Sequence, residues 1–77
     1  MANVDVEDIE MESVLSSNLA AIGYHEESQT LQVEFNSGQV YQYAGVPKEE
    51  FDNLRDAGSV GGYFASNIKR AYRGTKV

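Results

Sequence analysis

The pattern that sets the architecture lies in residues 30–43, which read TLQVEFNSGQVYQY. Residues 30–35 alternate polar and apolar side chains, which is typical of a strand with one buried face and one face in water. Residues 36–38 are a turn signal, Asn-Ser-Gly, and residues 39–44 make a second strand-like run. This stretch therefore predicts an antiparallel β-hairpin.

The length of the turn determines where Tyr41 and Tyr43 point, because side chains directly opposite each other in a hairpin share a face. A two-residue loop of Ser37 and Gly38 would put both tyrosines on the wet face. It would also need a left-handed backbone at Ser37, which a non-glycine residue disfavours. A three-residue loop, residues 36–38, leaves Gly38 alone in that conformation and turns both tyrosines toward the core. We favour the three-residue loop.

The flanking residues extend the hairpin into an α+β domain. Residues 19–24 form a short apolar run that predicts a preceding strand. Pro47 suits the first position of a helix that ends near Gly58, and Ser59 suits the cap of a second helix that runs to about Tyr72. The expected fold is a three-stranded antiparallel β-meander followed by two α-helices packed on one face.

Length and composition restrict the chain to one small domain. Its 77 residues allow one modest core, and the lack of cysteine excludes disulfides and thiolate chemistry. There is no long apolar run and no basic, apolar start, so we expect a cytoplasmic protein that does not bind membranes. The net charge of −6 opposes broad attraction to polyanions.

The charges are unevenly distributed along the chain. Residues 1–13 are acidic and offer little to bury, so we expect a flexible leader. Residues 14–73 form the predicted domain, and residues 74–77 form a C-terminal tail. Basic side chains gather at this end of the chain: Lys69, Arg70, Arg73 and Lys76.

Several short motifs, taken in order, resemble the KTSC domain, a module found at the C-terminus of some lysyl-tRNA synthetases and also as a stand-alone bacterial protein. The motifs are VLSSN (14–18), IGY (22–24), LQVEF (31–35), GQVYQY (38–43), VP (46–47), AGSVG (57–61), YF (63–64) and IKRAY (68–72). His25 departs from the family, in which we expect an acid at this position. The resemblance implies a fold but no established activity, and its association with synthetases suggests RNA or tRNA as a partner.

Two groups of side chains are candidates for binding RNA or another partner. Tyr41 and Tyr43 could stack on bases, or they could pack under the helices with their hydroxyls at the rim. On the second predicted helix, Lys69, Arg70 and Arg73 lie opposite the apolar face at about 100° per residue. They could contact phosphates, or they could be solvated cations that suit the negative end of the helix dipole.

The remaining motifs indicate structure rather than chemistry. Residues 16–18, Ser-Ser-Asn, could line a polar pocket, but such runs more often bond the backbone of a turn. The glycines at positions 58, 61 and 62 match neither the dinucleotide fingerprint nor the P-loop. His25 has neither further ligands for a metal nor a positioned nucleophile beside it. We therefore predict no catalytic residue, no metal and no cofactor.

Two functions are compatible with these features. The first is a small non-catalytic binding module for RNA, and the second is a protein-interaction or self-association module, such as a homodimer joined through free sheet edges. Binding to RNA should weaken steeply with salt, whereas protein association should persist at moderate salt.

Overall fold

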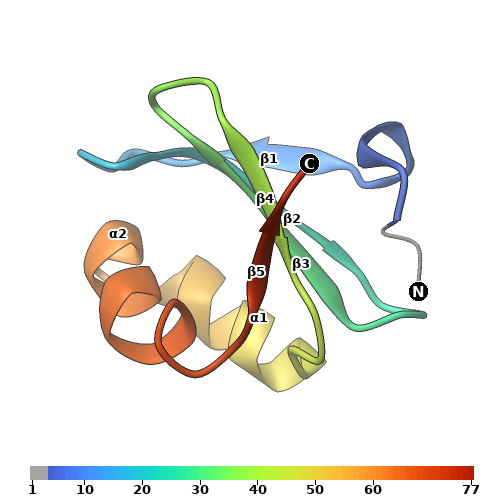
Figure 1. Cartoon of the computed structure of the whole chain (residues 1–77). Coiled ribbons are helices and arrows are strands. Elements are labelled where there is room, and N and C mark those ends of the chain that lie inside the picture. Colours follow the sequence, from blue (N-terminus) through green and yellow to red (C-terminus); the bar gives the residue numbers. More distant parts are fainter. Residues whose placement is uncertain (1–3) are drawn as a thin grey trace.

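The computed structural model describes residues 4–77, and it shows one antiparallel sheet with helices against one of its faces (Figure 1). The strands are β1 (Met11–Ser13), β2 (Leu19–His25), β3 (Thr30–Phe35), β4 (Val40–Tyr43) and β5 (Gly74–Lys76), and they lie side by side in this order. The helical elements are the 3-10 turn η1 (Val6–Asp8), the helices α1 (Lys48–Asp56) and α2 (Val60–Tyr63), and the π-type turn η2 (Phe64–Ile68). The α+β class and the antiparallel sheet predicted from the sequence are confirmed.

The predicted number of three strands is wrong, because β1 and β5 add an edge on each side of the meander. Each of these strands has only three residues, which is too short to show an alternating pattern. β1 lies within the segment predicted as a flexible leader, where Ile9 is also buried. β5 lies within the segment predicted as a tail. Residues 1–3 of the predicted leader lie outside the described residues.

The hairpin has the predicted three-residue loop. Val33 pairs with Tyr41 and Leu31 pairs with Tyr43, and Gly38 has a φ of 96°. Since paired residues share a face, both tyrosines lie on the face that packs against the helices.

The second helix is shorter than predicted. Ser59 caps it as expected, because its hydroxyl accepts a hydrogen bond from the Gly62 amide at 3.2 Å. After Tyr63 the helix changes to a π-type turn, in which the Lys69 amide bonds to the Phe64 carbonyl five residues earlier at 2.9 Å. Regular helix thus ends at Tyr63 and the π-type turn ends at Ile68, before the predicted end near Tyr72, and the chain then turns back to form β5.

The core lies between the helix-facing side of the sheet and the helices. Its buried side chains come from both layers: Leu19, Ile22, Leu31, Val33, Tyr43, Val46, Phe51, Leu54, Val60, Phe64 and Ile68. Phe51 and Leu54 are the side chains that α1 buries in this core. In the part of the chain that the structure describes, no helix is long and apolar enough to cross a membrane.

The opposite face of the sheet carries two buried glutamines that are covered by the N-terminal segment. The Gln42 amide donates to the side-chain oxygen of Gln32 and to the carbonyl of Val4, both at 2.7 Å. The Gln32 amide donates to the carbonyl of Val6 at 3.3 Å. Residues 4–9 therefore cover the far face of the sheet, held by polar contacts and by the buried Ile9.

Candidate functional site

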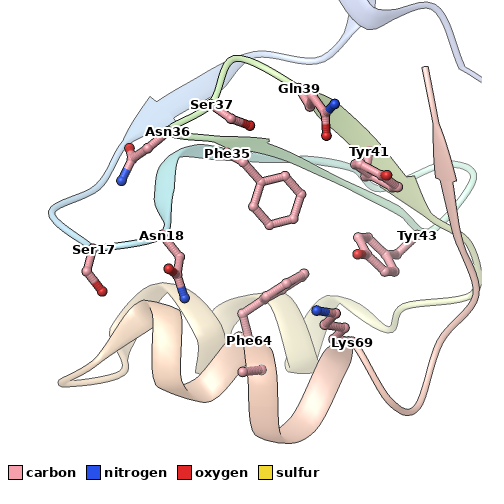
Figure 2. Close-up of a pocket in the computed structure, with 11 residues that line it drawn as sticks. Ser17, Asn18, Phe35, Asn36, Ser37, Gln39, Tyr41, Tyr43, Phe64 and Lys69 are labelled. Carbon is pink, nitrogen blue, oxygen red and sulfur yellow. The ribbon is translucent and has the colours of Figure 1, made fainter.

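A groove of about 610 Å³ lies between the β3–β4 hairpin and the second helix (Figure 2). Its aromatic part is formed by Phe35, Tyr41, Tyr43 and Phe64. Polar side chains from the hairpin loop and from the loop before β2 line the other part: Ser17, Asn18, Asn36, Ser37 and Gln39. Ala65 and Lys69 complete the lining. This volume is within the usual range for sites that hold a small molecule.

The aromatic side chains form one connected cluster. Phe35 meets Tyr41 edge to face with ring centroids 5.6 Å apart, and it meets Phe64 in the same manner at 5.7 Å. Tyr43 and Phe64 are 5% and 3% exposed, so their surfaces are used in the core. Phe35 and Tyr41 are only half-buried. These two rings are therefore the ones that can offer area to a ligand.

The structure changes which aromatic pair is available. The sequence singled out Tyr41 and Tyr43, and the structure places both beside the groove, but Tyr43 belongs to the core. Phe35 is not among the binding residues predicted from the sequence, although the alternation of residues 30–35 places it on the same face as Leu31 and Val33. Because Val33 pairs with Tyr41, Phe35 is the diagonal neighbour of Tyr41 on the same face.

Lys69 reaches the groove because of the π-type turn. In a regular helix, residues 64 and 69 would point about 140° apart, which is why the sequence placed Lys69 with the exposed basic face. A turn that closes over five residues brings Lys69 round toward the side of Phe64. Arg70 and Arg73 are exposed and do not line the groove. Of the three predicted basic residues, only Lys69 joins the tyrosines.

The groove is free of carboxylates although the chain is acidic. Lys69 is the one charged residue among its lining residues in the described part of the chain. Lys76 is paired with Tyr41 across β4 and β5, so the side chains of these two residues lie on the same face of the sheet. Two lysines therefore lie on the groove side of the sheet.

The polar part of the groove is built by a hydrogen-bonded turn. The Ser16 hydroxyl accepts hydrogen bonds from the amides of Asn18 and Leu19, at 3.1 and 3.2 Å. The Asn36 side chain donates to the Ser16 carbonyl at 3.2 Å, which ties this turn to the hairpin loop. The Ser-Ser-Asn run thus fixes a turn, as predicted, and Ser17 and Asn18 also line the groove.

The hydroxyl of Tyr43, which lines the groove, is a neutral hydrogen-bonding group. Burial, and to a smaller extent the neighbouring Tyr41, raises the pKa of Tyr43 above its ordinary value of 10.0. Its hydroxyl is therefore protonated at neutral pH and can donate a hydrogen bond.

His25 lies outside the groove, in the turn between β2 and β3. Its Nδ1 atom is 2.6 Å from the Ser28 hydroxyl and accepts a hydrogen bond from the Ser28 amide at 3.3 Å. These contacts give the histidine a structural role in the turn. Within residues 4–77, no group of three or more His, Cys, Asp or Glu side chains is close enough together to hold a metal ion.

Comparison with known proteins relates the chain to one family. Residues 15–72 match the family model of the KTSC domain. The chain is 47% identical over 54 residues to an uncharacterized protein of Stutzerimonas stutzeri, an alignment that covers 70% of this chain and 76% of the relative. It is 37% identical over 57 residues to a lysine–tRNA ligase of Nostoc punctiforme, covering 74% of this chain but only 10% of the ligase.

A solved structure agrees with this fold. The crystal structure of a KTSC domain protein from Yersinia pestis superimposes with a TM-score of 0.86 at 32% sequence identity. The match covers 90% of this chain and 97% of the other.

Proposed function

Because the chain belongs to the KTSC domain family, we propose that it is a small non-catalytic module that binds single-stranded RNA in the aromatic groove. The observation that carries this proposal is the chemistry of the lining: two accessible rings, Phe35 and Tyr41, beside Lys69 and without a carboxylate. Bases stack on exposed aromatic rings, and each such contact is worth about 1–3 kcal/mol in proteins that bind single strands. The lysine suits the phosphate that follows the base.

The relatives support RNA as the polyanion. Similar segments occur in lysine–tRNA ligases of Nostoc and Trichormus species, where they make up about a tenth of the enzyme. A short module attached to an enzyme that is named for tRNA is well placed to add RNA affinity. The same module in a small protein would act on its own, and the predicted cytoplasmic location accords with an RNA partner.

The structure sets a modest scale for the electrostatic part of binding. Lys69 and Lys76 lie on the groove side of the sheet, which allows about two phosphate contacts. For single strands each contact adds about −0.7 to the slope of log affinity against log salt, so we expect a slope near −1.4. Raising the salt from about 50 to about 200 mM should therefore weaken binding about sevenfold.

The test is a titration with a short single-stranded oligonucleotide at these two salt concentrations, followed residue by residue by NMR. We expect contiguous shifts at Phe35, Tyr41 and Lys69. The matched pair of variants is Lys69→Gln and Arg70→Gln, which remove the same charge from adjacent residues, of which only the first lines the groove. Lys69→Gln should weaken binding and flatten the salt slope, whereas Arg70→Gln should bind like the wild type.

Two results would contradict this proposal. Equal losses in the two variants would mean that binding depends on general charge and not on the groove. Shifts scattered over no contiguous surface, or no shifts, would remove RNA binding altogether. Tyr41→Leu is a further check, because it should lower affinity by the value of one stacked base, about 1–3 kcal/mol, at unchanged salt slope.

A self-association module is the second candidate, and it has its own observations. Both outer strands, β1 and β5, leave an unpaired edge in the described sheet, and Leu15 next to β1 is fully exposed. Sheet edges and exposed apolar side chains promote pairing between copies. A homodimer of this kind should persist at moderate salt in sedimentation velocity and should weaken in Leu15→Ser. A single monomeric species at high protein concentration would exclude it.

A further inference from the structure

We propose that the groove recognises one unpaired adenine, with the side-chain amides of Asn18 and Gln39 reading two edges of a base stacked on Phe35 and Tyr41. This inference rests on the proposed RNA binding and adds selectivity to it. It assigns sequence recognition to residues that the charge pattern of the chain does not point to.

The groove is open at the tip of the β3–β4 hairpin. Gln39 lies directly opposite Phe35 in the hairpin, where its carbonyl accepts a hydrogen bond from the Phe35 amide at 2.9 Å. Paired residues share a face, so Gln39, Phe35 and Tyr41 face the same side at the tip of the hairpin. The inner rungs, with Leu31, Val33 and Tyr43, are covered by the helices. A flat ligand therefore has access only at the tip.

Two polar side chains, Asn18 and Gln39, lie around this tip. Figure 2 shows the Phe35 ring between Asn18 on one side and Gln39 on the other. The loop before β2 supplies Asn18 and the hairpin supplies Gln39, so the two amides approach from different elements. A base resting against Phe35 would present a different edge to each amide.

The side-chain amides of Asn18 and Gln39 are available to bond a ligand. The Asn36 amide is already bonded to the Ser16 carbonyl. In residues 4–77, the side chains of Asn18 and Gln39 are exposed and form no hydrogen bond with the protein. A base edge would replace only their water, and no internal contact would be lost.

The hydrogen-bonding groups of the groove determine which base it would prefer. An amide offers one donor and one acceptor, which matches the N6 and N7 atoms of adenine. Guanine is read by the paired donors of Arg or Lys, and cytosine by a carboxylate. No Arg, Asp or Glu is among the described residues that line the groove, and its one lysine, Lys69, is assigned to the phosphate that follows the base. Uracil has a donor next to an acceptor on one edge only, whereas adenine has this pair on both its Watson–Crick and its Hoogsteen edges. Two amides on different sides therefore favour adenine.

The experiment compares four short oligouridines that differ only in the central base, A, G, C or U. Affinities are measured by fluorescence anisotropy at one salt concentration, so that the phosphate contribution is the same for all four. We expect the oligomer with a central adenine to bind about tenfold tighter than the others, within the range for one well-formed amide–base pair. Gln39→Leu should reduce the preference for adenine while binding is retained, because Asn18 still reads the other edge of the base. Asn53→Leu on the exposed side of α1 is the matched control and should keep the preference.

The outcomes separate this inference from the proposed function. Equal binding of the four oligomers by the wild type would overturn adenine recognition and leave RNA binding intact, whereas no binding of any oligomer would overturn both. A preference for guanine would also overturn the inference, because it would mean that Lys69 reads the base and not a phosphate. Gln39→Glu is a second variant at this exposed position next to the hairpin loop. It leaves only acceptors, so the ratio of the cytosine to the adenine oligomer should rise, and an unchanged ratio would count against base reading by Gln39.

Discussion

Replacing Gly23 by alanine should detach the N-terminal segment from the sheet. Gly23 lies in β2, on the far face of the sheet, where the segment before β1 crosses directly over it. A Cβ atom at this position would lie 2.5 Å from the carbonyl oxygen of Glu10 and 2.8 Å from the Cγ2 atom of Ile9. The first contact is with backbone and cannot be relieved by a side-chain rotation, so the segment has to move.

The magnitude follows from the contacts that the segment would lose. Ile9 is 4% exposed, and burying an isoleucine side chain is worth about 1.5–3 kcal/mol. The Gln32 and Gln42 amides would exchange their bonds to backbone carbonyls for water, at a cost of about 0.5–1.5 kcal/mol each. Replacing a glycine by alanine also stabilises the folded protein by about 0.4–1 kcal/mol, because alanine lowers the conformational entropy of the unfolded chain. We expect a net loss of about 1.5–5.5 kcal/mol.

The assay is urea unfolding together with amide hydrogen exchange in β1. Gly58→Ala is the matched control, because a Cβ atom there would have nothing within 4 Å. The free energy of unfolding of the control should equal the wild-type value or exceed it by up to about 1 kcal/mol, because alanine lowers the conformational entropy of the unfolded chain. If Gly23→Ala were as stable as the control, with unchanged exchange in Met11–Ser13, the segment would not be packed on the sheet and the reasoning would be refuted.

Two further changes test the contacts that hold the sheet to its neighbours. Tyr24→Phe removes the hydroxyl that donates to the buried Val46 carbonyl at 2.5 Å, so the free energy of unfolding should fall by about 1–3 kcal/mol in urea titrations. Burial and the nearby carboxylates raise the pKa of Tyr24 above 10.0, so its contribution is complete below that pH and is lost as the pH rises through the raised value. The wild type should therefore lose its advantage over Tyr24→Phe in strong alkali, and a constant difference would contradict this account. Gly74→Ala would place a Cβ atom 2.5 Å from the ring of the buried Tyr43, so β5 should loosen, with a loss of about 1–3 kcal/mol and faster amide exchange in β5. Unchanged exchange there would show that the strand is not packed against this ring.

The hairpin could be predicted because local chemistry determines it. Residues 30–35 alternate without error, and Gly38 is the one residue of its loop that adopts a left-handed backbone readily. These two facts fix the register, and the register fixes which face carries Tyr41. The KTSC resemblance added agreement on the fold but not the position of any binding residue.

The edge strands and the π-type turn could not be predicted for a physical reason. β1 and β5 contain three residues each, and they are held by pairing with a neighbouring strand and not by their own propensity. The partner of β1 is the next strand along the chain, whereas β5 pairs with β4, which both helices separate from it in sequence. The π-type turn depends on how the helix meets the sheet, and helical periodicity assumes a regular turn throughout. This one local change moves Lys69 from the exposed basic face into the groove. A helical wheel drawn from the sequence therefore separates Lys69 from Phe64, whereas in the fold both residues line the groove.

The two faces of the sheet make the proposed binding of a polyanion compatible with the acidic composition of the chain. The acidic segment crosses the far face, where Asp5, Glu7 and Asp8 are exposed, while Lys69 and Lys76 lie on the helix-facing side. At physiological salt the Debye length is about 8 Å, and the molecule is 20 Å across in its shortest direction. Charges on the far face are thus largely screened at the groove, whose described lining contains Lys69 and no carboxylate. The net charge of −6 therefore describes the whole molecule but not the surface that an RNA strand would meet.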